Sequence, residues 1–149
     1  MAGTAAKLEG FGGWLLLIAF GQWLGVFGAL GRFMVALPDN ARQWGDPIGQ
    51  RTMIGEAALD LGLIAFMLYT AIVMTMKGRG FPTLFRIETA LFVVVPLLSI
   101  WWGSASTGMP LDKASFAATV GQAIVGTIGA SLSILYSLRS ARVRNTFVN

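Results

Sequence analysis

Two acidic residues, Glu56 and Asp60, lie inside a segment from Arg51 to Met76 that is otherwise almost entirely apolar. Because they are four residues apart, a helix would place both carboxylates on the same face. A bare carboxylate in hydrocarbon is strongly disfavoured, so this face must meet protein, water or a cation. These residues are therefore the first candidates for chemistry, and other helices must assemble around them.

The preceding apolar segment contains a cation, Arg32, at a predicted depth similar to that of Asp60. Glu56 would lie nearer the membrane surface. We favour a structural ion pair between Arg32 and Asp60, which would make the charges tolerable and fix the register of the helices. The alternative is a proton or cation site, because carboxylates within membranes can relay protons.

The composition indicates a membrane protein. Of the 149 residues, 55% are hydrophobic and 12% are charged, whereas soluble domains carry about 25% charged residues. Long apolar runs cover about residues 11–37, 52–76, 83–103 and 115–138. Most of the charged residues lie in the short intervals between these runs. We predict an all-α fold, an integral membrane four-helix bundle that forms a single transmembrane domain and ends in a short basic tail, residues 139–149.

The basic residues predict how the bundle is oriented. Four spans place both termini on the same side, which carries Lys7, Lys77, Arg79, Arg86, Arg139, Arg142 and Arg144. The opposite side carries Arg32, Arg42, Arg51 and Lys113. Because Lys and Arg accumulate in cytoplasmic loops, both the N and the C terminus should be cytoplasmic.

Several classes of function are disfavoured by the residues that the chain lacks. It contains no cysteine and no histidine, which removes thiolate nucleophiles, imidazole bases and the usual zinc, copper or haem ligands. We therefore predict no enzyme, no cofactor and no metal site. The net charge of +4 is explained by membrane topology, so nucleic acid is not a predicted partner.

Small residues form stripes on two of the predicted helices. Gly21, Gly25 and Gly28 share one face of the first span, and Gly126 and Gly129 share one face of the fourth. Small side chains let helices approach closely in a membrane. Internal packing is the simplest interpretation, with homodimerisation and docking to another subunit as the alternatives.

Other polar groups in the spans have structural interpretations. Gln22 and Gln122 are predicted to form hydrogen bonds between helices, and the indole N–H of Trp23 needs an acceptor. Glu88 and its neighbour Arg86 are placed at the membrane interface near the start of the third span. There the helix dipole would stabilise the carboxylate.

Aromatic residues and prolines indicate where the spans end. Trp44, Trp101 and Trp102 are predicted to form an interfacial belt, and residues 38–50 are predicted to be a loop because they are rich in turn-forming residues. Pro82 is placed in the first turn of the third helix, where the missing N–H is tolerated.

The two ends of the chain carry motifs that resemble a known family. Gly12-Gly13-Trp14-Leu15 opens the first span, and Tyr136 is followed by Ser140-Ala141-Arg142-Val143-Arg144-Asn145-Thr146-Phe147-Val148. These motifs resemble those of DUF2569, a bacterial membrane family of unknown function. The resemblance implies a four-span protein of the bacterial inner membrane, and it implies no activity and no catalytic residue.

The basic tail has its own physical interpretation. Arg139, Arg142 and Arg144 follow the last span directly, where each cation near anionic lipid contributes about 1 kcal/mol. We predict that these arginines and Phe147 contact lipid or a partner. Lipid contact and docking of residues 146–148 on the protein's own cytoplasmic rim are favoured over docking to a partner.

The sequence favours a non-catalytic protein of the bacterial inner membrane that acts through helix packing. Its predicted role is an accessory or assembly subunit of a larger membrane complex, with the lipid bilayer and a membrane protein, or a second copy of the chain, as partners. The alternative is a small proton- or cation-coupled transporter or channel that uses Glu56 and Asp60.

Overall fold

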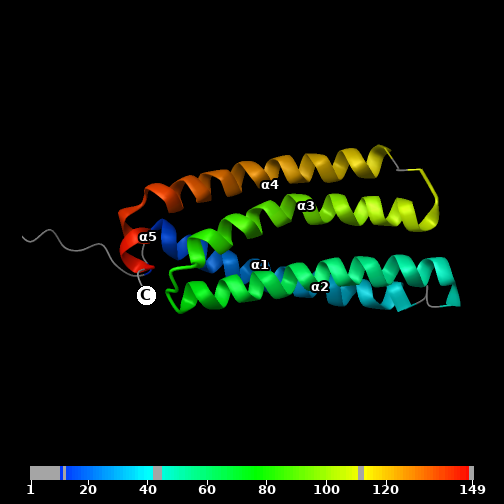
Figure 1. The fold of residues 1–149 in the computed structure, drawn as a ribbon, viewed down its shortest axis with the longest axis horizontal. Helices are drawn as coiled ribbons and strands as arrows, with labels where there is room; N and C mark the ends of the chain where they lie inside the picture. The colour runs from blue at the N-terminus through cyan, green and yellow to red at the C-terminus, as the bar shows by residue number, and fades with distance from the viewer. Residues whose placement is uncertain (1–10, 12, 42–44, 111–112, 148–149) are drawn as a thin grey trace, which may run out of the picture.

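A computed structural model describes residues 11, 13–41, 45–110 and 113–147 of the chain. Its elements are α1 (Trp14–Ala41), α2 (Pro47–Thr75), α3 (Phe81–Thr107), α4 (Lys113–Arg139) and the short α5 (Ala141–Thr146). Within those ranges every regular element is a helix (Figure 1). The all-α prediction is confirmed.

Each long helix contains a segment that is long and apolar enough to cross a membrane. The segments are Trp14–Leu37, Pro47–Thr75, Phe81–Thr107 and Phe116–Tyr136. Large apolar side chains cover the outside of the bundle, for example Phe20, Val35 and Leu132. Such a surface is suited to lipid rather than water. The chain is thus a multi-pass membrane protein.

The loop between the first two spans is shorter than predicted, because helical structure continues beyond the apolar segments. α1 extends to Ala41 and α2 begins at Pro47. The carboxylate of Asp46 accepts hydrogen bonds from the backbone N–H groups of Gly49 at 2.8 Å and Ile48 at 3.4 Å. This capping lets the helix start in a polar stretch, which hydropathy does not detect.

The third helix begins as predicted and ends later. Pro82 occupies the first turn of α3, as expected. The helix continues past the predicted end near residue 103 to Thr107, and Gly108 closes it with a φ of 68°. Glycine adopts this left-handed conformation without a steric penalty, so it is the residue that stops the helix.

The helices pack mainly in the order of the chain, α1 on α2, α2 on α3 and α3 on α4. Figure 1 shows α3 lying between α4 and α2. One apolar cluster joins α1 to α2 through Val26, Ala29 and Met67. In the spanning segment of α4, by contrast, none of the side chains that the structure describes is buried. α4 is therefore attached along one side only.

The basic tail folds back on the bundle. α5 is capped by Ser140, whose hydroxyl accepts a hydrogen bond from the N–H of Val143 at 3.4 Å. The ring of Phe147 lies 4.6 Å from that of Phe81 and 6.3 Å from that of Phe11, measured between centroids. The end of the bundle where α1 starts, α4 stops and α5 docks is called the α5 end below.

This docking agrees with the self-docking alternative for Phe147 and corrects the prediction that its side chain contacts lipid or a partner. Its side chain is buried within the chain itself and is not available to lipid or to a partner. Arg139 and Arg144 are exposed, as a lipid contact requires. Val148 and the side chain of Arg142 lie outside the described residues. The tail therefore docks on its own bundle through an apolar side chain and keeps those two arginines at the surface.

The glycines do not all pack within the chain. A Cβ at Gly25 would lie 3.3 Å from the Met67 side chain, so α1 and α2 approach closely there. At Gly21, Gly28, Gly126 and Gly129 no described atom lies within 4 Å of such a Cβ. Internal packing therefore explains Gly25 and leaves the other four glycines facing open space.

The tightest glycine contact is one that the sequence did not reveal. A Cβ at Gly55 of α2 would overlap the indole ring of Trp102 on α3. The Trp102 Nε1–H donates to the carbonyl of Thr52 at 3.2 Å. Trp102 thus packs between two helices rather than only marking an interface, whereas Trp101 is exposed. Trp44 lies outside the part of the chain that the structure describes.

Candidate functional site

The three charged residues that the sequence singled out line a single cavity. Arg32 from α1 and Glu56 and Asp60 from α2 face a space of about 820 Å³ that is also bounded by α3 and α4. Its other polar lining groups come from α3 and α4: Thr89, Ser99, Thr119, Gln122 and Thr127. This space, called the central cavity below, therefore brings charged and polar side chains together with apolar ones such as Leu63 and Phe92.

The charges in the central cavity interact without direct pairing. The Arg32 guanidinium attracts the Asp60 carboxylate electrostatically, and the carboxylates of Asp60 and Glu56 repel each other. Among the described residues, no ion pair or hydrogen bond joins Arg32 to either carboxylate. Glu56 approaches α3, where a Cβ at Gly103 would lie 3.5 Å from its Oε1 atom. The sequence thus identified residues that meet in one cavity, and the structure holds them apart around open space.

Gln122 differs from its prediction. It was expected to form a hydrogen bond between helices, but its side chain is exposed and lines the central cavity. Trp23, whose indole was expected to need an acceptor, donates from Nε1 to the hydroxyl of Thr75 at 3.3 Å. That expectation is confirmed.

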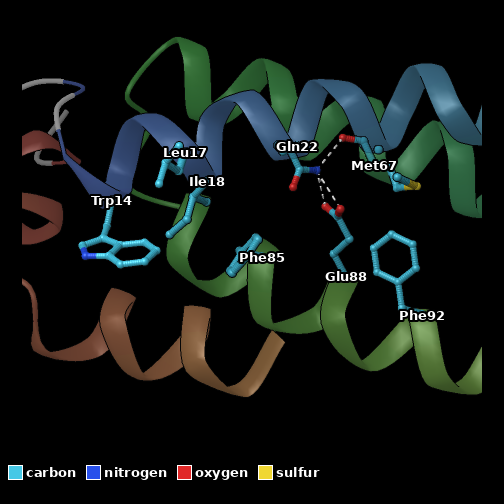
Figure 2. Close-up of a pocket in the computed structure, with 10 residues that line it drawn as sticks. Trp14, Leu17, Ile18, Gln22, Met67, Phe85, Glu88 and Phe92 are labelled. Atoms are coloured by element: carbon cyan, nitrogen blue, oxygen red, sulfur yellow. Dashed lines mark hydrogen bonds between the residues drawn. The ribbon is translucent and has the colours of Figure 1, made fainter. Parts of the chain in front are cut away.

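The prediction for Glu88 is wrong. Glu88 was predicted to lie at the membrane interface, yet its side chain is only 2% exposed. The Gln22 Nε2 group on α1 donates to both of its carboxylate oxygens, at 2.6 and 2.8 Å (Figure 2). The same nitrogen lies 3.3 Å from the carbonyl oxygen of Met67 on α2. One amide thus connects three helices, and the prediction for Gln22 is confirmed.

The helical period contained the signal that would have placed Glu88 correctly. Arg86 is two residues away, so a helix puts it on nearly the opposite face, and it is exposed. Phe81, Phe85 and Phe92 share the face of Glu88 at helical spacing. That face is directed into the bundle, because Phe81 is fully buried.

Glu88 and Gln22 line a second cavity of about 330 Å³ between α1 and α3. Its remaining walls are largely apolar and include Trp14, Phe85 and Phe92. Figure 2 shows Trp14 at one end of this space and Phe92 at the other, with Glu88 between Phe85 and Phe92. Phe92 also lines the central cavity. The two cavities therefore adjoin at this ring.

The chemistry available at both cavities is that of carboxylates at membrane depth. Within the described ranges, no group of three or more acidic side chains is arranged to hold a metal ion. The cavities offer acceptor oxygens, one guanidinium and aromatic walls. Groups of this kind bind cations and protons.

Comparison with known proteins places the chain in a family. No curated protein and no solved structure matches the sequence. The family described as "Protein of unknown function (DUF2569)" matches residues 8–148, which is nearly the whole chain. The resemblance first noticed at the two ends therefore extends through the helices that build both cavities, and the chain belongs to the DUF2569 family.

Proposed function

We propose that this protein is a non-catalytic membrane carrier that binds a proton or a monovalent cation in the central cavity. The observation that carries the proposal is the placement of Glu56, Asp60 and Arg32 around one cavity, in which Arg32 makes no direct ion pair with either carboxylate. A purely structural ion pair would bring the guanidinium and a carboxylate into contact and would leave no space between them.

The balance of charge supports a positively charged ligand. Two carboxylates face the cavity with one guanidinium, so one negative charge is left without a countercharge when all three groups are ionised. An unbalanced charge at membrane depth is costly. A proton or a monovalent cation would remove that cost, and the volume of about 820 Å³ is sufficient for a small organic cation.

The proposed setting is the bacterial inner membrane with both termini in the cytoplasm. Seven of the eleven basic residues lie on the side of the termini, which supports this orientation. The exposed Arg139 and Arg144 follow the last span, where they would contact anionic lipid.

The test is transport in proteoliposomes. Proton flux is followed with a dye inside the vesicles, and cation flux is followed with radiolabelled phenyltrimethylammonium, which carries a permanent charge. Asp60→Asn should reduce the flux of whichever ion is carried by about tenfold or more, since a charge-assisted contact is lost. Transport of neither ion by the native protein would contradict the proposal.

The matched control is Asp46→Asn. It makes the same chemical change at a residue outside the central cavity, and asparagine caps a helix about as well as aspartate. Flux through Asp46→Asn should equal that of the native protein. Equal flux through Asp60→Asn would also contradict the proposal.

A second candidate function is the accessory or assembly subunit. It is favoured by α4, because none of the described side chains in its spanning segment is buried and Val125, Ile128 and Leu132 are exposed. Such a face is suited to close packing against a further helix. Native mass spectrometry from lipid nanodiscs would show a second copy or another membrane protein bound to the chain. A monomer alone would contradict this candidate and leave the carrier proposal intact.

A further inference from the structure

We propose that the cavity beside Glu88 is a second binding site for an alkyl- or aryl-ammonium cation, situated between the α5 end of the bundle and the central cavity. It is called the Glu88 groove and is lined by Trp14, Gln22, Phe85, Glu88 and Phe92. The site itself stands on the contacts described below, whereas its place on a route to the central cavity rests on the proposed function.

Among the residues that the structure describes, the carboxylate of Glu88 has hydrogen-bond partners but no cationic partner. Its contacts are with the neutral side chains of Gln22 and Thr70. Arg86, the nearest cation along the helix, is exposed on another face. Burying a carboxylate among neutral groups is costly even when its hydrogen bonds are made. A cation in the groove would supply the missing charge.

Gln22 directs a second acceptor into the groove. Its side chain is 7% exposed, and its Nε2 group is used by Glu88 and by the Met67 carbonyl. In the described part of the chain, its carbonyl oxygen has no hydrogen-bond donor. Figure 2 shows this oxygen pointing away from Glu88, toward the space between Ile18 and Phe85. Because this oxygen is accessible from the groove, it can accept a hydrogen bond from a ligand that carries an N–H group.

The walls of the groove suit the rest of such a ligand. Trp14, Phe85 and Phe92 present aromatic rings, and aromatic rings around a carboxylate are a common means of holding an ammonium group. The apolar remainder of the ligand would lie along Leu17 and Ile18 of α1. The volume of about 330 Å³ fits a compact cation with one ring or a short chain.

The groove also has a defined relation to the central cavity. Phe92 lines both spaces. Of two adjacent residues on the same helix, Glu88 lines the groove and Thr89 lines the central cavity. A cation held at Glu88 is therefore separated from Asp60 by the Phe92 ring and the helix that carries it. The acid of the groove is on α3 and the acids of the central cavity are on α2, and Phe92 lines both spaces.

The experiment uses fluorotryptophan incorporated into the full chain and fluorine NMR in detergent micelles. The chain has five tryptophans, and Trp14→Phe assigns the resonance of Trp14. Phenyltrimethylammonium is titrated against the protein. The neutral control is tert-butylbenzene, which has the same shape without the charge. The Trp14 resonance should shift with the cation and not with the neutral molecule.

Variants separate this inference from the proposed function. Glu88→Gln keeps an acceptor for Gln22 and removes the charge, so it should weaken the cation-dependent shift of Trp14 by about tenfold. Asp60→Asn should leave that shift unchanged, even if it abolishes transport. An equal shift with tert-butylbenzene, or no shift with the cation, would overturn the inference. Because that comparison needs only native protein, it holds even if Glu88→Gln fails to fold.

Discussion

The Nε2 group of Gln22 on α1 lies 2.6 and 2.8 Å from the two carboxylate oxygens of Glu88 on α3. It also reaches the carbonyl of Met67 on α2 at 3.3 Å. A single amide therefore satisfies a buried acid and joins three of the four long helices. This contact is the polar centre of the half of the bundle nearest α5, and it defines one wall of the Glu88 groove.

Gln22→Leu should destabilise the protein, because it leaves the Glu88 carboxylate without its main donor. A buried polar group that loses its partner costs about 1–3 kcal/mol, and more when it is charged. The measurement is thermal unfolding in detergent. The control is Gln122→Leu, since Gln122 is exposed on α4 and should tolerate the same change. Equal losses for both variants would refute the role assigned to Gln22.

Phe147→Ala should detach the tail from the bundle. Phe147 is 6% exposed and packs on Phe81, and truncating a buried phenylalanine costs about 3–5 kcal/mol. Trypsin should then cleave after Arg144 faster than in the native protein. Phe20→Ala removes an exposed ring and should leave the cleavage rate unchanged. Equal cleavage of native protein and Phe147→Ala would mean that the tail is held by other contacts.

Gly55→Ala should lower the thermal stability, because the added methyl group overlaps the indole of Trp102. Overpacking of this kind typically costs about 1–3 kcal/mol. Gly62→Ala, in the same helix, meets no described atom and should be neutral or stabilising, since alanine favours helix by up to about 1 kcal/mol. Replacing Trp102 with Leu should reduce the cost of Gly55→Ala. A harmless Gly55→Ala would contradict the contact between α2 and α3.

Phe92→Trp should slow transport of phenyltrimethylammonium while the cation still binds beside Trp14. Phe92 lines both cavities, so a larger ring there narrows the passage without removing either carboxylate. Flux into proteoliposomes and the fluorine shift of Trp14 are measured on the same variant. Phe20→Trp, at an exposed position on α1, serves as the control. Unchanged flux through Phe92→Trp would place the route elsewhere.

The membrane architecture could be predicted because it follows from hydropathy. The four apolar runs, the absence of strands in the described residues and the position of Pro82 all follow from composition and local geometry. The helix ends did not, since Asp46 and Gly108 set them by capping in polar stretches. Hydropathy therefore predicts which segments can span the membrane, whereas capping residues determine where each helix begins and ends.

The candidate sites were only partly predictable. Glu56, Asp60 and Arg32 stand out as charges in apolar segments, and the structure does bring them to one cavity. The burial of Glu88 was not predicted, because a carboxylate that lies near a helix start and close to an arginine is usually found at the membrane interface. Its burial depends on where α1 places Gln22, a contact between residues 66 positions apart. Local sequence does not contain such a pairing.

The central claim is that the intramembrane carboxylates bind a cation. Its most direct test is equilibrium dialysis of purified protein in nanodiscs against radiolabelled phenyltrimethylammonium, with tert-butylbenzene as competitor. The account predicts saturable binding that the neutral competitor does not displace and that falls when Asp60→Asn and Glu56→Gln are combined. Binding unchanged in that double variant, or absence of saturable binding together with absence of proton flux into proteoliposomes, would contradict it.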